Sequence, residues 1–199
     1  MSENLRDLLL LVYTPREDST QRKYDDWLRD VDNPFFNGVP GIQHYTNWKI
    51  TSPADCAVPY TYFDLMYVED KDKLDDIWGN PDVEKFAQGW TDSWGRYPDA
   101  TPEKMDKNYQ VYLCEMTSGD LMTPWQPAAF MTAQSSVPQA ENRRTFQVLS
   151  PVLGDQRFSY FGMQPLNNTS EYAAAAAARP SECYGCALGE LVASPDPQG

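Results

Sequence analysis

His44 is the only histidine of the chain and the residue best suited to move a proton at neutral pH. An unperturbed imidazole has a pKa of about 6.5, so it can both accept and donate a proton. Two further proton carriers, Tyr62 and Asp64, follow it in the sequence. A carboxylate can orient an imidazole, and a phenol can bond a developing oxyanion. These residues predict general acid-base chemistry, with His44, Tyr62 and Asp64 as the catalytic side chains.

Each of these residues also has an interpretation without catalysis. His44 can be a core histidine bonded to a backbone carbonyl, and Asp64 can be an edge residue that faces water. Glu115 interrupts another apolar pattern and is a reserve acid, although a strand end in solvent explains it as well. The side chains that either line an aromatic-binding cavity or form ordinary core are Tyr13, Trp48, Met66 and Tyr112, with Glu115 beside them.

Two strands joined by an irregular connection should position the three catalytic candidates. Residues 42–50 and 60–68 alternate at a period of two and are rich in aromatic and β-branched residues. Alternation places His44 on one face of the first strand with Trp48, and it places Tyr62 and Asp64 together on one face of the second strand. If those two faces converge, they form a polar site inside a hydrophobic pocket.

The first half of the chain alternates between strands and helices. Residues 8–13 and 109–116 indicate two more strands, and residues 24–31 form an amphipathic helix. Residues 70–94 indicate a second helical region with a break at Gly79-Asn80-Pro81. The order β-α-β-β-α-β predicts the α+β class, with a ferredoxin-like antiparallel sheet and both helices on one face. The other face needs cover, and a second such sheet is the usual cover.

The chain divides into a ferredoxin-like domain over residues 1–117 and a second part over residues 118–199. In the second part, residues 145–149, 157–163 and 184–193 indicate strands. The alanine-rich residues 171–179 indicate a helix that stops at a proline. This β-β-α-β order is either a C-terminal extension, which could wrap a partner subunit, or a degenerate second repeat.

Several segments of residues 1–117 resemble the dimeric α/β-barrel superfamily, particularly its EthD-like and REDY-like branches. They are the strand ending at Tyr13, the helix through Tyr24-Asp-Asp-Trp27, the strand opening Gly-Val-Pro-Gly-Ile-Gln-His44-Tyr, and the helical region from Trp78 to Phe86. The resemblance implies a barrel closed by two ferredoxin-like sheets, usually from a homodimer, and a cavity for an aromatic or polyketide-like substrate. Members include cofactor-free cyclases, oxygenases, isomerases and decarboxylases, haem-dependent enzymes, and proteins without known catalysis.

Composition limits the partners and cofactors. With 16 Lys and Arg against 29 Asp and Glu, the net charge of −13 argues against nucleic acid and anionic membrane as partners. No signal peptide or membrane span is evident, which favours the cytoplasm. The four cysteines, Cys56, Cys114, Cys183 and Cys186, are expected to be free thiols. Because the chain has one histidine and no glycine-rich nucleotide motif, we expect no cofactor and no metal.

The sequence thus predicts a cofactor-independent enzyme that acts on a hydrophobic aromatic or polyketide-like molecule by proton transfer. The reaction would be that of a lyase, such as a decarboxylase or dehydratase, or of an isomerase or cyclase. The alternatives are a non-catalytic small-molecule binding module and a cofactor-free monooxygenase of the same superfamily. Arg157 or Lys49 could bind a substrate carboxylate, although a surface charge is the simpler interpretation of each.

Overall fold

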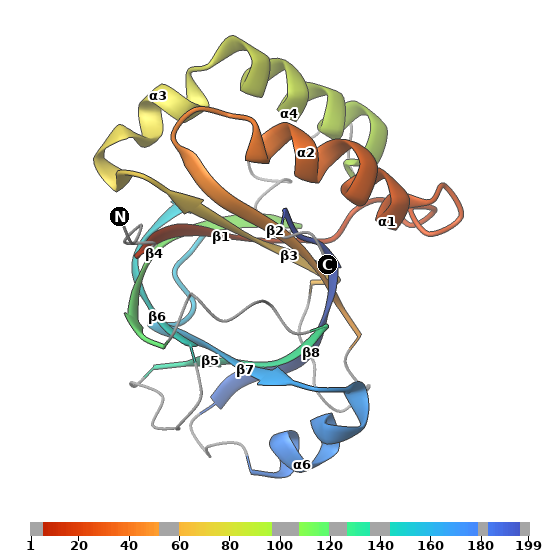
Figure 1. The fold of residues 1–199 in the computed structure, drawn as a ribbon, viewed down its shortest axis with the longest axis vertical. Helices are drawn as coiled ribbons and strands as arrows, with labels where there is room; N and C mark the ends of the chain where they lie inside the picture. Colours follow the sequence, from red (N-terminus) through yellow and green to blue (C-terminus); the bar gives the residue numbers. More distant parts are fainter. Residues whose placement is uncertain are drawn as a thin grey trace.

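A computed structural model describes residues 6–51, 60–96, 108–119, 127–135, 144–178 and 183–195, except for the side chains of residues 183 and 184. Within these ranges, eight antiparallel strands close a barrel (Figure 1). In their order around it they are β1 (Asp7–Tyr13), β3 (Tyr62–Val68), β2 (Ile42–Ile50), β8 (Cys183–Ala193), β5 (Ala128–Gln134), β7 (Tyr160–Leu166), β6 (Arg144–Leu153) and β4 (Tyr109–Ser118). The predicted α+β class with an antiparallel sheet is confirmed.

Each half of the chain contributes four neighbouring strands to the barrel. The first half gives the order β4-β1-β3-β2, and the second half gives β6-β7-β5-β8. In both halves the first and third strands are central and the second and fourth are at the edges. The edges meet where β2 pairs with β8 and where β4 pairs with β6. The second sheet therefore covers the face of the first sheet that lacks helices.

Short helices cover the outer face of the first sheet (Figure 1). They are α1 (Tyr24–Trp27), the π-helical turn η1 (Leu28–Asp32), α2 (Asn33–Asn37), the 3-10 turn η2 (Lys71–Lys73), α3 (Leu74–Trp78) and α4 (Pro81–Trp94). The predicted break is present, because α3 ends at Trp78 and the Asn80 side chain caps α4 by accepting from the Asp82 amide. On the opposite side of the barrel, η3 (Thr169–Glu171) and α6 (Tyr172–Ala177) pack beside the second sheet (Figure 1).

The π-helical turn sets the position of Asp32 at its C-terminal end. Pro34 follows two residues later and lacks the N–H that an α-helix would give to the Asp30 carbonyl. The Asn33 amide instead donates to the Leu28 carbonyl, five residues back. This wider turn places Asp32 against the sheet, where the side chain is buried.

Alternation along the strands divides the apolar side chains between two cores. On β1, Leu8 and Leu10 pack inside the barrel, whereas Leu9 and Leu11 pack under the helices. Both faces of this strand are therefore buried, which explains its continuous apolar run. The barrel interior and the space between sheet and helices are separate compartments, and each contains a cavity.

The second half departs from the predicted elements in two places. Strand β5 was not predicted, because its sequence, Ala-Ala-Phe-Met-Thr-Ala-Gln, has few residues typical of strands. Strand β7 begins at Tyr160, so Arg157 lies in the preceding loop and not in a strand. The helix expected over residues 171–179 is a 3-10 turn followed by α6, and Arg179 lies outside the described residues. No helix in the described ranges is long and apolar enough to span a membrane.

Candidate functional site

Two buried aspartates meet on the helix-facing side of the first sheet. Asp32 from η1 and Asp64 from β3 are each 3% exposed. The Tyr45 hydroxyl lies 2.9 Å from Asp32 Oδ2 and 2.8 Å from Asp64 Oδ2. The Asn47 amide donates to Asp32 Oδ2 at 2.8 Å and to Asp64 Oδ1 at 3.0 Å. A phenol and an amide thus bridge the two carboxyl groups.

The number of available hydrogens shows that this pair holds a proton. A phenol has one hydrogen to donate, yet the Tyr45 oxygen is within hydrogen-bonding distance of both carboxyl groups. If both carboxyls were ionised, one of these contacts would join two oxygens with no hydrogen between them. One carboxyl must therefore donate to Tyr45 while Tyr45 donates to the other. Reversing both bonds moves the proton from one aspartate to the other.

Burial favours the protonated form of both carboxyl groups. It raises the pKa of Asp32 to about 7, although the bonds from Asn47 and Tyr45 act in the opposite direction. The pKa of Asp64 is raised well above its ordinary value, first by burial and then by the charge of Asp32. Since the two groups interact, they titrate as a pair. Burial and the repulsion between the two carboxylates therefore both favour a proton on the pair.

A second chain of hydrogen bonds reaches Asp64 from helix α4. The Trp90 indole donates to the Tyr24 hydroxyl at 2.9 Å, and Tyr24 donates to the Tyr13 hydroxyl at 3.3 Å. Tyr13 in turn donates to Asp64 Oδ1 at 3.3 Å. Burial raises the pKa of both tyrosines well above the ordinary value, so they remain neutral donors. These bonds hold Asp64 in place.

A cavity of about 280 Å³ adjoins the carboxyl pair, between the first sheet and the helices. Asp32, Asp64 and Tyr45 form part of its wall, and most of the remaining wall is aromatic or aliphatic. Such a combination of apolar walls and a few polar groups is typical of small-molecule sites. Trp78 also lines the cavity, and its buried indole nitrogen has no hydrogen-bond partner among the described residues. The indole would have to turn toward the cavity for this N–H to donate to an oxygen atom of a ligand.

His44 does not belong to this site. Residues opposite each other in an antiparallel pair project to the same side, and His44 lies opposite Tyr67 while Asp64 lies opposite Asn47. His44 therefore faces the barrel, with its ring 6.0 Å from the Tyr67 ring, and Asp64 faces the helices. The prediction that their faces converge is wrong. Both faces of β3 are buried, so periodicity could not show which face each residue of β2 would meet.

Tyr62 is on the helix side but is engaged elsewhere. Its hydroxyl donates to Asp25 Oδ1 at 2.6 Å, and the same carboxylate accepts a bond from Lys49 Nζ at 2.7 Å. Burial raises the pKa of Tyr62, so it stays protonated. Its ring stacks on that of Tyr13, with centroids 5.8 Å apart. Tyr62 thus supports the site from outside the cavity, and Lys49 is already paired with a carboxylate.

The predicted ligand-binding residues are divided among three places. Tyr13 lines the helix-side cavity, as predicted, whereas Tyr112 lines the cavity inside the barrel. Trp48 is buried in the barrel core, and Met66 is buried under the helices. Glu115 is half-buried near the end of β4 and lines neither cavity. These side chains do not form one pocket, because neighbouring positions on a strand face opposite compartments.

Sequence reasoning missed Asp32, Tyr45, Asn47 and Trp78. For Asp32 a signal existed, because it follows Leu28 by four residues and so interrupts the apolar stripe of that helix. Tyr45 and Asn47 lie on the face of β2 opposite His44, and that face is the one that meets Asp64. For Trp78 the sequence offered no signal beyond its place in an apolar stripe.

The cysteines differ from the prediction. Cys186 is disulfide-bonded and Cys114 is a buried free thiol, so the expectation of four free thiols is wrong. Cys56 and the side chain of Cys183 lie outside the described residues. In the part of the chain that the structure describes, no group of three or more His, Cys, Asp or Glu side chains could hold a metal ion.

A comparison with protein families matches residues 9–100 to a family described as REDY-like protein HapK. This match covers just under half of the chain and shows a likeness of that part to the REDY-like family. It runs from β1 to just beyond α4, so the matched region contains both aspartates of the pair and confirms the resemblance predicted from the sequence. A comparison with curated proteins found no significant match.

Two solved structures share the fold over both halves of the chain. One is described as an anthrone oxidase-like protein, with a TM-score of 0.56, 9% sequence identity, and coverage of 96% of this chain and 93% of that chain. The other is described as a "Putative monooxygenase" from Fusobacterium nucleatum subsp. nucleatum ATCC 25586, with a TM-score of 0.54, 11% identity and the same two coverages. At these identities the likeness concerns the fold. It extends over residues 9–100 and the second sheet alike.

Proposed function

We propose that this chain is a cofactor-independent enzyme that transfers a proton on a hydrophobic aromatic or polyketide-like molecule bound in the helix-side cavity. The observation that carries the proposal is the pair Asp32 and Asp64, which is buried, holds a proton and lines an apolar cavity. A carboxyl with a pKa near neutrality can act both as a base and as an acid at physiological pH. Structural neighbours named for oxidase and monooxygenase activity agree with an enzyme.

In the proposed mechanism the ionised carboxylate of the pair removes a proton from a carbon or hydroxyl of the substrate. The electron pair left behind moves onto a substrate oxygen, which accepts a hydrogen bond from the Trp78 indole. Tyr45 can pass the proton between Asp32 and Asp64, so either carboxyl can return it to another atom of the substrate. Of the predicted catalytic residues, the mechanism keeps Asp64 and assigns no step to His44 or Tyr62.

This chemistry suits a lyase, such as a decarboxylase or dehydratase, or an isomerase or cyclase. A dehydratase, isomerase or cyclase needs a proton to be removed from one atom and delivered to another, and a decarboxylase needs a proton delivered to the carbon that loses CO₂. None of these reactions exchanges electrons with a cofactor. The dry aromatic walls would hold the ring, while the carboxyl pair would act at one edge of it.

A cofactor-free monooxygenase is the second candidate, and the anthrone oxidase-like neighbour favours it. Anthrone is a carbon acid, and removal of its proton gives a carbanion that can react directly with dioxygen. The two candidates therefore share the first proton transfer. They differ in whether dioxygen is consumed afterwards.

The experiment is an incubation of the purified protein with anthrone and a set of phenolic carboxylic acids in D₂O, with and without dioxygen, followed by mass spectrometry. Product formed without dioxygen supports the lyase or isomerase, and product formed only with dioxygen supports the monooxygenase. Deuterium uptake into the substrate supports the first proton transfer, which both candidates share. Asp64→Asn should abolish either result, whereas Asp30→Asn, which removes an exposed carboxyl two residues from Asp32, should not. Binding of these compounds without exchange or product would contradict the enzyme and indicate a binding module.

A further inference from the structure

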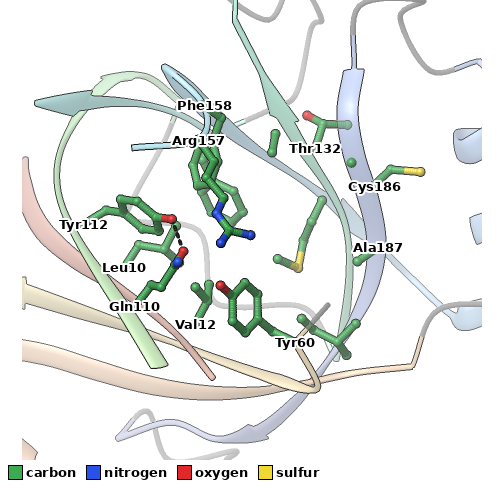
Figure 2. Close-up of a pocket in the computed structure, with 15 residues that line it drawn as sticks. Leu10, Val12, Tyr60, Gln110, Tyr112, Thr132, Arg157, Phe158, Cys186 and Ala187 are labelled. Atoms are coloured by element: carbon green, nitrogen blue, oxygen red, sulfur yellow. Dashed lines mark hydrogen bonds between the residues drawn. The ribbon is translucent and has the colours of Figure 1, made fainter. Parts of the chain in front are cut away.

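A second cavity, of about 80 Å³, lies inside the barrel, on the other side of the first sheet from the carboxyl pair (Figure 2). Strands of both halves form its wall, including Val12 of β1, Tyr112 of β4, Met131 of β5 and Ala187 of β8. Its surface is almost wholly apolar. Among the fifteen lining residues, Arg157 alone carries a formal charge at neutral pH.

Arg157 reaches this cavity from the loop between β6 and β7. Figure 2 shows its guanidinium group between Tyr60 on one side and Gln110 and Tyr112 on the other. Arg157 makes no hydrogen bond or ion pair with the residues that the structure describes. Although the chain has a net charge of −13, none of the described residues that line the cavity carries a carboxylate to neutralise this cation. The mouth of the cavity is therefore positive in an otherwise acidic protein.

The loop that carries Arg157 is anchored to the barrel at both ends. At its start, Gly154 has φ +88°, and a Cβ at this position would lie 2.9 Å from Gln110 Cγ, so only glycine lets the loop lie this close. The Tyr112 hydroxyl oxygen lies 3.3 Å from the Asp155 carbonyl oxygen. At its end, the Ser159 amide donates to the Gln134 carbonyl at 3.0 Å. Gln110 itself is 1% exposed and accepts from Tyr112 Oη, so the site rests on rigid, buried side chains.

We propose that this cavity binds a small monocarboxylate, with its carboxylate on Arg157 and its hydrocarbon part inside the barrel. Arginine matches a carboxylate with two parallel hydrogen bonds, and an apolar wall favours a hydrocarbon chain over water. The cavity is about half the size of a 150 Å³ cavity that accepts benzene, so it can enclose about three carbons. A six-carbon acid would place these carbons inside the barrel and its remaining carbons at the mouth beside Arg157. The helix-side cavity would not take such a ligand equally well, because two aspartates line it.

The test is a calorimetric titration of the full chain with hexanoate, hexanol and hexylammonium. We expect hexanoate to bind at least tenfold more tightly than either of the other two. Arg157→Gln should reduce hexanoate affinity to that of hexanol, and Arg29→Gln, which removes an exposed arginine of η1, should leave it unchanged. Equal affinity of wild type and Arg157→Gln for hexanoate would overturn the proposal, as would absence of hexanoate binding at millimolar concentration.

Two further variants locate the ligand. Ala133→Leu adds side-chain atoms at the half-buried mouth of the barrel cavity and should abolish hexanoate binding, with a melting temperature close to that of wild type. Asp64→Asn changes only the helix-side site and should bind hexanoate as wild type does. Loss of binding in Asp64→Asn with full binding in Ala133→Leu would place hexanoate in the helix-side cavity and overturn the proposal. Because this site does not depend on the carboxyl pair, its failure would leave the proposed function intact.

Discussion

Tyr45 lies between two buried carboxyl groups and can donate its single hydroxyl hydrogen to only one of them. Tyr45→Phe removes the bridge, so the proton can no longer move between the aspartates. We expect turnover to fall by about 10²-fold and the free energy of unfolding to fall by about 1–3 kcal/mol, since polar atoms lose a buried partner. Steady-state kinetics and urea unfolding measure these effects. Unchanged turnover in a folded Tyr45→Phe protein would show that the bridge has no catalytic role.

Asp32 should make the protein less stable as the pH rises. Its pKa is about 7 when folded, against about 3.9 when unfolded, so the folded state holds a proton that the unfolded chain has already lost. The contribution of Asp32 to the free energy of unfolding is fully present below about pH 4, and it is lost as the pH rises to about 7. In Asp32→Asn this loss is absent, because an amide does not titrate. From pH 5 to pH 7, the unfolding free energy of wild type should therefore fall relative to that of Asp32→Asn by about 1.4 kcal/mol for each pH unit.

Urea unfolding of wild type and Asp32→Asn at pH 5 and pH 8 checks this expectation. Subtracting one protein from the other removes the contributions of all carboxylates that do not interact with Asp32, and Asp64 is the one that does. Asp30→Asn, which alters an exposed carboxylate of the same turn, is the matched control and should show no such shift. A difference that is independent of pH for Asp32→Asn would mean that Asp32 has an ordinary pKa.

Trp78 offers a hydrogen-bond donor that has no partner among the described residues in the ligand-free protein. Trp78→Phe keeps an aromatic wall and removes this donor. Its stability should be equal to or slightly above that of wild type, because a buried unpaired N–H is lost. Activity should fall by about 10- to 100-fold in kcat/KM, about 1.4–2.7 kcal/mol of transition-state stabilisation. Trp27→Phe, in a half-buried tryptophan outside the cavity, is the control, and an equal loss there would refute the role of Trp78.

At the residue level the sequence supported part of the site. Asp64 and Tyr13 could be selected because they interrupt or line apolar strands. Their true partners could not be selected, since the pairing of Asp64 with Asn47 depends on the register between β2 and β3. His44 was chosen for its intrinsic pKa. A raised carboxyl pKa, which arises from burial, was not visible before the fold was known.

Substitution of two glycines by alanine should change the stability of the protein in opposite directions, according to the local structure in which each glycine lies. Gly89 is in the middle of α4, and a Cβ there would meet no atom within 4 Å. Gly89→Ala should stabilise the protein by about 1 kcal/mol, because alanine loses less backbone freedom on folding into a helix. Gly154→Ala should destabilise it by at least about 1 kcal/mol, since its φ is positive and Gln110 is too close. Thermal unfolding measures both, and the same sign for the two variants would contradict these local structures.

The helices and strands of the first half could be predicted because their hydrophobic periodicity and the proline and glycine residues that end them indicate the same boundaries. The helix break at Gly79-Asn80-Pro81 follows from proline and capping chemistry alone. Strand β5 could not be predicted, because alanine has low strand propensity and the strand forms only between β7 and β8. The π-helical turn at Leu28–Asp32 was also not predicted, although Pro34 provides a local cause for it.

At the scale of the whole molecule, one chain supplies both sheets of the barrel. We propose that residues 118–199 are a degenerate second repeat, because their strands have the same order as those of the first half. The helix expected between the first two strands of such a repeat is not among the described residues. In this arrangement a homodimer, which the resemblance implies, is not needed to close the barrel.

Removal of residues 120–199 tests this arrangement. The truncated chain would lose the strands that pair with the edges of β2 and β4, and the apolar barrel face of the first sheet would be exposed. We expect it to dimerise or aggregate, as light scattering after size exclusion would show. A stable, folded monomer of residues 1–119 would contradict the dependence of the first sheet on the second.

The central claim is that Asp32 and Asp64 together hold a proton at neutral pH. The most direct measurement is an NMR titration of the protein labelled with ¹³C at the aspartate carboxyl carbons, with Asp32→Asn and Asp64→Asn used to assign the signals. The account predicts one carboxyl that titrates near pH 7 and a second whose pKa is raised well above the ordinary value of an aspartate. Two aspartate signals that both ionise below pH 5 would contradict it.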